Sequence, residues 1–338
     1  MDWVADFWIP VIKAIVVALV LLTGSAYMTW GERKICARFQ VRYGPNRAGP
    51  FGILQPLADG VKAIFKEEII PNLPSRQDKV IYVMAPGLSF AAVLITFAVI
   101  PFGPEVDLFG KQVGLWIGDV NAGLLFLLAV AGLGSYGVVL GGWSSNNKYS
   151  LLGALRAAAQ MISYELPMGL ALVSIVVIVG SLNLNRIVEF QGNWPLVALQ
   201  PIGVLLFLIA ILAESNRSPF DLPETENELI SGFMTEYGGI KFALYYIAEY
   251  AAMVVNSAIF ATVFLGGWKW PAVLSNLHPL VGVALFLAKV TFVLFLFVWI
   301  RTSVPRVRYD KFMRFCWKFM VPLALINLAV TAVVVALC

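Results

Sequence analysis

The sequence is poor in charged residues and in the side chains that bind metals. Only 13% of its 338 residues are charged, whereas 60% are hydrophobic, and a soluble domain has about 25% charged residues. There is one histidine, His278, and the three cysteines, Cys36, Cys316 and Cys338, are far apart with no CxxC pair. These shortages exclude an ordinary soluble domain and argue against a zinc, haem or iron–sulfur site built from this chain alone.

Long apolar runs fill most of the chain instead. A hydrocarbon core about 30 Å thick takes roughly 20 apolar residues to cross as a helix, so the runs predict an all-α polytopic membrane protein with about eight transmembrane helices and long cytoplasmic loops. The predicted spans are 7–30, 80–100, 120–141, 157–180, 196–213, 242–265, 280–300 and 315–337. Because no repeat or linker divides the chain, we expect 1–338 to form a single membrane domain.

The distribution of lysine and arginine predicts how the spans are oriented. Basic residues accumulate in cytoplasmic loops, and the two alternating sets of loops hold nineteen and three of them. We therefore expect the basic-rich loops to be cytoplasmic and both termini to lie outside the cytoplasm. Lys289 lies near the middle of its span, where we expect it to face a carboxylate or a polar cavity.

The first long loop, residues 32–79, combines positive charge, tight turns and an amphipathic helix. Apolar residues recur at helical spacing from Leu54 to Phe65, which predicts an interfacial helix over 56–67. The Gly- and Pro-rich segment 43–52 before it restricts the chain to tight turns. The pattern is compatible with a positively charged interfacial anchor and equally with a frame around an opening through which an amphiphilic molecule leaves the bilayer.

The loop at residues 214–241 is acidic. It contains Glu214, Asp221, Glu224, Glu226, Glu228 and Glu236 against two basic residues, Arg217 and Lys241. A solvated acidic face is one interpretation. The other is a group of carboxylates whose mutual repulsion favours protonation, so that they hold and pass protons.

Two glutamates lie inside apolar spans. Glu165 and Glu249 each follow the predicted cytoplasmic start of their span by about eight residues, or about 12 Å of helix. Glu249 shares a helical face with Tyr246, Tyr250 and Asn256, which predicts a polar stripe. Each glutamate is either a structural acid bonded to a neighbouring helix or a proton carrier, and the cost of a carboxylate in lipid favours the functional interpretation.

Several motifs, in order along nearly the whole chain, resemble one family. They are residues 32–34, 38–59, 66–68, 143–153, 163–165, Glu214 with 218–224, 235–237, 248–250, and 300–302 with 305–310. The family is the H subunit of the bacterial NADH-quinone oxidoreductase, respiratory complex I. The resemblance implies a component of a proton-translocating enzyme that is not catalytic alone and lies where the hydrophilic arm meets the membrane arm.

The resemblance also implies site residues. Quinone would reach the soluble arm through a chamber that includes Glu32, Arg33, Arg38, Arg42 and Asp59. The proton relay would consist of Glu165, Glu214 and Glu249, with an acidic funnel of Asp221, Glu224, Glu226 and Glu228. Some members have a further glutamate in the third span, where this chain has Ala131-Gly132-Leu133-Gly134, so water or a partner subunit would have to replace that step.

Cofactors and partners follow from the same resemblance. The chain itself would bind no cofactor or metal; quinone is the substrate, and FMN and iron–sulfur clusters are expected in partner subunits. The expected partners are soluble quinone-module subunits, antiporter-like membrane subunits and lipid of the bacterial inner membrane, and not nucleic acid. Two alternatives stay open: a subunit of a related complex with another electron donor, such as a membrane hydrogenase or ferredoxin-linked dehydrogenase, and an independent ion-coupled transporter, for which matching broken helices would be expected.

Overall fold

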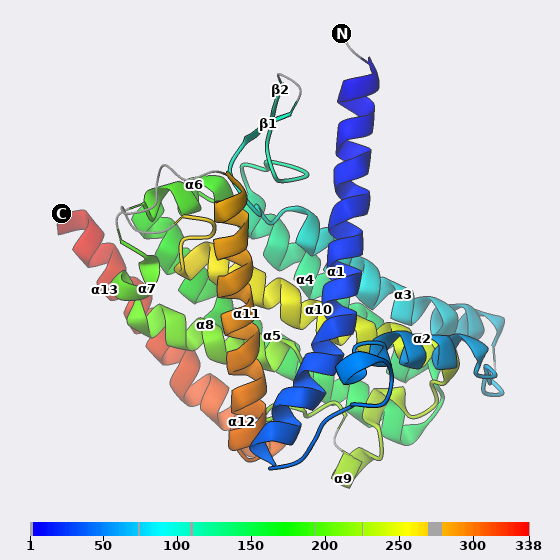
Figure 1. The fold of residues 1–338 in the computed structure, drawn as a ribbon. Helices are drawn as coiled ribbons and strands as arrows, with labels where there is room; N and C mark the ends of the chain where they lie inside the picture. The colour runs from blue at the N-terminus through cyan, green and yellow to red at the C-terminus, as the bar shows by residue number, and fades with distance from the viewer. Residues whose placement is uncertain are drawn as a thin grey trace.

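Helices make up most of the protein in the computed structural model (Figure 1). The structure describes residues 3–73, 75–108, 111–192, 194–224, 226–269 and 279–337, without the side chains of 3–6, 107, 108, 111, 112, 226 and 227. The long helices are α1 (Trp3–Phe39), α3 (Arg76–Ala98), α4 (Gly123–Ser144), α5 (Lys148–Val179), α10 (Gly239–Phe264) and α11 (Pro279–Ser303). A last long helical segment consists of α12 (Tyr309–Phe315), the π-helical turn η3 (Cys316–Met320) and α13 (Val321–Leu337). Within these described ranges, seven helices are long and apolar enough to cross a membrane, which confirms the all-α multi-pass prediction.

Shorter elements connect the long helices. They are η1 (Pro50–Gly52), α2 (Gln55–Phe65), α6 (Leu184–Phe190), α7 (Leu196–Leu199), α8 (Pro201–Glu214), α9 (Glu226–Leu229) and η2 (Gly232–Met234). A small antiparallel hairpin pairs β1 (Val106–Leu108) with β2 (Lys111–Val113) in the register Val106 opposite Val113. Helix α2 is the predicted amphipathic helix, ending two residues before its predicted end.

The predicted span 196–213 is divided into α7 and α8. Gln200, with φ −129° and ψ 58°, separates them, and Pro201 begins α8 at a position where its missing N–H is not needed. The Gln200 side chain donates to Thr331 at 2.7 Å and accepts from Asn327 at 3.0 Å, both on α13. Polar side chains thus stabilise a break in a membrane helix, which periodicity alone does not predict.

Two helices begin earlier than their apolar runs do. The side chain of Asn147 accepts the backbone N–H of Tyr149 and caps α5, which begins at Lys148 and not at 157. Glu165 therefore lies seventeen residues after the start of α5, whereas Glu249 lies ten after the start of α10. The prediction of about eight residues was wrong for Glu165, because the Asn147 cap begins α5 before its apolar run, and it was two residues short for Glu249.

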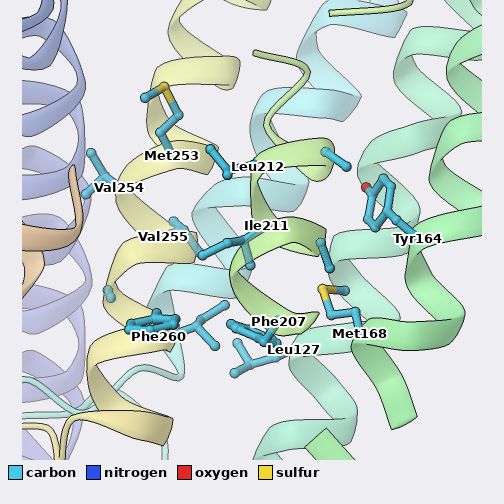
Figure 2. Close-up of a cluster of buried hydrophobic side chains, with 14 of the residues drawn as sticks. Leu127, Tyr164, Met168, Phe207, Ile211, Leu212, Met253, Val254, Val255 and Phe260 are labelled. Carbon is cyan, nitrogen blue, oxygen red and sulfur yellow. The ribbon is translucent and has the colours of Figure 1, made fainter. Parts of the chain in front are cut away.

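Helix α10 is the most deeply buried of the long helices and packs against α1, α3 and α11. Figure 2 shows part of this core, where the ring centre of Phe260 lies 6.2 Å from that of Phe207 on α8. Helices α3 and α4 also approach closely, because a Cβ on Gly137 would lie only 2.1 Å from Ser89 Oγ. This packing places the polar residues of α10 inside the bundle.

Candidate functional site

The three glutamates predicted for the relay line one cavity inside the bundle. Glu165 comes from α5, Glu214 from the end of α8 and Glu249 from α10, and α3 and α4 complete the wall of this cavity of about 80 Å³. Its other polar lining residues include Tyr164, Tyr245 and Asn256. Such a volume holds several water molecules where polar partners are present. The structure therefore joins three carboxyl groups from separate helices in a space that water can fill.

The cavity has a polar part and an apolar continuation. A second cavity of about 20 Å³ shares Glu214 and Asn256 with the first, but its remaining lining is apolar and includes Leu127, Met168 and Phe207, which lie in the cluster of Figure 2. Glu214 and Asn256 therefore mark the boundary between the polar cavity and the apolar core.

Arg217 is the counter-ion that sequence reasoning missed. Its Nη2 lies 3.4 Å from Glu249 Oε2, and its guanidinium lies 4.2 Å from the ring centre of Tyr250. Burial acts to lower the pKa of Arg217, but the carboxylates of Glu249 and Glu224 raise it above its ordinary value. Arg217 therefore stays charged beside Glu249, which lines the cavity. The feature of the sequence that could have indicated this role is a single arginine next to the acidic residues that follow α8.

Gln160 of α5 holds the Arg217 segment in place. Its Nε2 donates to the carbonyl of Ala213 at 2.7 Å and to that of Phe220 at 3.0 Å. These two carbonyls lie on either side of Arg217, so one buried amide fixes the turn that brings the guanidinium to Glu249. The sequence has no distinctive pattern around Gln160 that would predict this role.

The predicted polar stripe of α10 is divided between two environments. Asn256 lines the cavity together with Glu249, two helical turns away. Tyr246 and Tyr250 lie under the guanidinium of Arg217, with 3.2 Å between their hydroxyl oxygens. Glu249 belongs to both environments, because it pairs with Arg217 and lines the cavity together with Asn256.

The predicted acidic funnel also separates. Glu224 acts electrostatically on both Arg217 and Glu249, and Asp221 acts on Glu249 more weakly. Glu228 instead pairs with Arg156 of α5 at 2.5 Å. The side chain of Glu226 lies outside the described residues. The structure therefore brings Asp221 and Glu224 to the Arg217–Glu249 pair and directs Glu228 elsewhere.

Two of the predicted chamber residues connect α1 to α2. Arg33 Nη1 lies 2.8 Å from Asp59 Oδ2, and both side chains are partly exposed. Next to this pair, α2 has no buried residue, and Leu57, Ile64 and Phe65 are exposed. An apolar surface thus borders a charged pair, as an opening for an amphiphilic molecule would require.

The other three predicted chamber residues have different neighbours. Glu32 is buried and forms an ion pair with Arg301 of α11. Arg38 lies 5.9 Å from the ring centre of Tyr43, and Arg42 donates to Gln40 at 2.7 Å. Of the five, the structure brings only Arg33 and Asp59 into contact with each other.

A chain of polar groups leads from α2 to the cavity. Arg33, paired with Asp59, also lies within interaction range of the Tyr246 hydroxyl. Tyr246 contacts Tyr250, whose ring lies against Arg217, and Arg217 in turn pairs with Glu249. This succession spans α1, α2 and α10 and connects the predicted chamber to the predicted relay.

Two further expectations concern Lys289 and the third span. Lys289 Nζ donates to the carbonyls of Leu265, Gly267 and Lys269 at 2.6 to 2.8 Å. The described acceptors of this ammonium are thus backbone carbonyls at and after the end of α10, which accept its N–H hydrogen bonds. In the third span, a Cβ on Gly132 would lie 3.4 Å from Glu165 Oε1. The segment of the third span that lacks the further glutamate therefore lies next to the carboxyl group of Glu165.

Comparison with known proteins decides the family. A model of the family described as NADH dehydrogenase matches residues 12–332. The chain belongs to this family. The H subunit of the NADH-quinone oxidoreductase of Syntrophotalea carbinolica is 49% identical over 95% of this chain and 94% of that protein. An H subunit from Syntrophobacter fumaroxidans is 47% identical over 98% of this chain and 97% of its own length, and the one from Deinococcus deserti is 47% identical over 98% and 85%. These matches confirm the resemblance, and with it a membrane component of NADH-quinone oxidoreductase.

Proposed function

We propose that this protein guides quinone to the soluble arm of the complex and conducts protons through the cavity between α5, α8 and α10. The observation that carries the proposal is the convergence of Glu165, Glu214 and Glu249 on one cavity. Carboxyl groups that share a buried space repel one another when ionised, so each is readily protonated and can pass its proton to water or to its neighbour. The apolar cavity beyond Glu214 and Asn256 favours passage sideways between helices over direct passage across the membrane.

Quinone would approach along the exposed apolar side of α2. The Arg33–Asp59 pair lies at that surface, and the polar chain through Tyr246 and Arg217 supports communication with Glu249. A change of charge or water content at the quinone then alters the field at Arg217, and through it the proton affinity of Glu249.

The setting of the protein follows from this function. We infer that FMN and iron–sulfur clusters belong to soluble partner subunits, that antiporter-like membrane subunits take over the protons, and that both termini lie outside the cytoplasm of a bacterial inner membrane. The excess of basic residues in the loops that contain Arg33 and Arg308 supports this orientation. Purification of the intact complex and identification of its subunits tests the electron donor, because a hydrogenase or ferredoxin-linked relative would co-purify with different soluble chains.

The proton path is tested by Glu249→Gln. Glutamine keeps the volume of the side chain but cannot titrate, so coupled turnover of the assembled complex should fall about hundredfold. Glu249→Asp should retain part of the activity, and Glu105→Gln, an exposed glutamate, should leave it unchanged. Proton translocation into proteoliposomes and quinone reduction are measured together. Full coupled turnover in an assembled Glu249→Gln complex would refute the proton-carrier role of Glu249.

The quinone path is tested by Ala58→Trp on α2. The bulky indole should slow reduction of long-tailed quinone about tenfold because it narrows the approach along α2. Reduction of an artificial acceptor by the soluble arm should be unaffected, and so should both activities in Ala336→Trp, at an exposed position in α13. Equal loss of both activities in an assembled Ala58→Trp complex would favour a structural fault instead.

A further inference from the structure

Lys241 is a buried lysine in the first turn of α10, and the proton path described above does not include it. Its side chain is 9% exposed, and its Nζ lies 3.0 Å from Glu68 Oε2. The ammonium also lies 5.6 Å from the ring centre of Tyr82 on α3. A buried lysine is costly unless it is paired, so this ammonium depends on Glu68, three residues after the end of α2.

Beside this ion pair, the backbone at Gly239 packs closely against residues 66–68. Gly239, the first residue of α10, has φ +56°, a conformation that side chains rarely adopt. A Cβ at Gly239 would lie 3.2 Å from Glu68 Cγ and 3.2 Å from the carbonyl oxygen of Lys66. Steric fit and charge therefore hold the segment 66–68 against the start of α10.

Helix α2 packs against α1 and α10 through residues that stay at least partly exposed. None of its residues is buried, and its ion pair to α1, between Arg33 and Asp59, is about 40% exposed on both sides. Exposed pairs of this kind contribute little to stability. Of the two ion pairs, the one between Glu68 and Lys241 is the more buried. Lys241 belongs to α10, and Glu249 lies eight residues after it in the same helix.

We propose that Lys241 is a positioning residue that fixes α2 to α10 through Glu68, so that a displacement of α2 by quinone is transmitted along α10 to Glu249. A helix transmits a shift of its first turn because its backbone hydrogen bonds make it stiff along its axis. This inference rests on the proposed function: α2 borders the quinone path and Glu249 carries protons. It adds the connection between the two.

The test compares Lys241→Met with Lys241→Arg in the intact complex in proteoliposomes. Methionine keeps most of the aliphatic stem but removes the charge, so α2 should loosen. The KM for decylubiquinone should rise about fivefold, and the number of protons translocated per electron should fall to about half. Lys241→Arg should restore both values nearly to wild type. Lys62→Met, at an exposed lysine of α2, is the matched control and should change neither value.

Assembly and the proposed function are controlled separately. The subunit composition of the purified complex reports assembly, and ferricyanide reduction reports the soluble arm; both should be unchanged in every variant. If Lys241→Met does not assemble, Glu68→Gln breaks the same pair from its more exposed side and should give the same two changes. An assembled Lys241→Met or Glu68→Gln complex with wild-type KM and wild-type proton stoichiometry overturns the positioning role. A raised KM in Lys241→Met, together with full coupled turnover in Glu249→Gln, would support the attachment of α2 through Lys241. The same pair of results would reject Glu249 as the proton carrier.

Discussion

Buried polar groups in two regions of the bundle differ in how completely they are hydrogen-bonded. Beyond the end of α10, the ammonium of Lys289 donates to three backbone carbonyls. Nearby, the amide of Gln191 donates to the carbonyls of Thr262 and Val263, and its oxygen accepts the N–H of Leu196. These side chains occupy fixed positions, and each one closes a gap in the backbone hydrogen bonding of the helices.

The cavity at the other end of the bundle is different. Within the part of the chain that the structure describes, neither carboxylate oxygen of Glu249 has a hydrogen-bond partner, although Oε2 lies 3.4 Å from Arg217. In that part of the chain, the amide nitrogen of Asn256 and two nitrogens of the neighbouring Arg217 also lack a hydrogen-bond partner of ordinary geometry, although Asn256 lies within interaction range of Glu214. Buried polar atoms usually find partners, so open ones that face a cavity are suited to water and mobile protons. The comparison predicts that the paired side chains after α10 have a structural role and that the open ones at the cavity have the role proposed above.

The strongest test of this comparison is Arg217→Met, which removes the only described ion-pair partner of Glu249. An unpaired carboxylate in this site takes up a proton and holds it, so turnover of the assembled complex should fall about hundredfold, equivalent to about 2.7 kcal/mol. Arg217→Lys keeps the charge but not the planar group over Tyr250, and should retain part of the activity. Normal quinone-reductase and pumping rates in Arg217→Met would contradict the comparison.

Lys289→Met should lower the stability of the complex and leave its turnover unchanged, in contrast to Arg217→Met. Loss of the ammonium leaves three carbonyls without this donor, while the cost of burying the charge disappears, so the net destabilisation should be roughly 2 kcal/mol. We expect a lower midpoint of thermal inactivation but unchanged turnover per assembled complex. Thr291→Val, at an exposed threonine of the same helix, is the control for stability. A selective loss of pumping without destabilisation would show that Lys289 belongs to the proton path.

The fold was largely predictable because lipid imposes simple rules on sequence. Apolar runs located all the long helices, and helical spacing found α2. The break at Gln200 was not predicted, since it depends on Asn327 and Thr331 from a helix more than a hundred residues away. The extension of α5 to Lys148 was missed because its start depends on the Asn147 cap, and Lys148 and Arg156 interrupt the apolar sequence of its first turns.

The candidate site was predictable in its acids but not in its counter-ions. Glu165 and Glu249 stand out because a carboxylate is rare within an apolar run. Arg217 and Gln160 occur in polar surroundings or look unremarkable, and their roles arise only when the turn after α8 folds back onto α5 and α10. Charge in the acidic loop was likewise assigned as one group, although Glu228 pairs with Arg156.

Gln191→Met sharpens the comparison within the fully paired region. Methionine fills a similar volume but neither donates to the carbonyls of α10 nor accepts from Leu196, so stability should fall by about 1 to 1.5 kcal/mol. Turnover per assembled complex should be unchanged. The measurement is again the midpoint of thermal inactivation, and Gln77→Met, at an exposed position in the first turn of α3, is the matched control. A stability equal to wild type would mean that these hydrogen bonds contribute nothing net.

The smallest effect is expected for Glu228→Gln. Glu228 lies in the acidic segment and was predicted to belong to the funnel, but its carboxylate pairs with Arg156 at 2.5 Å and is 46% exposed. A partly exposed pair contributes less than about 1 kcal/mol, and the carboxylates that act on the Arg217–Glu249 pair are Asp221 and Glu224. Pumping and stability should therefore stay close to wild type, whereas Glu224→Gln should slow pumping measurably. If Glu228→Gln slows pumping as much as Glu224→Gln does, the acidic segment acts as one group, and the open hydrogen-bonding positions around Glu249 do not by themselves define the proton path.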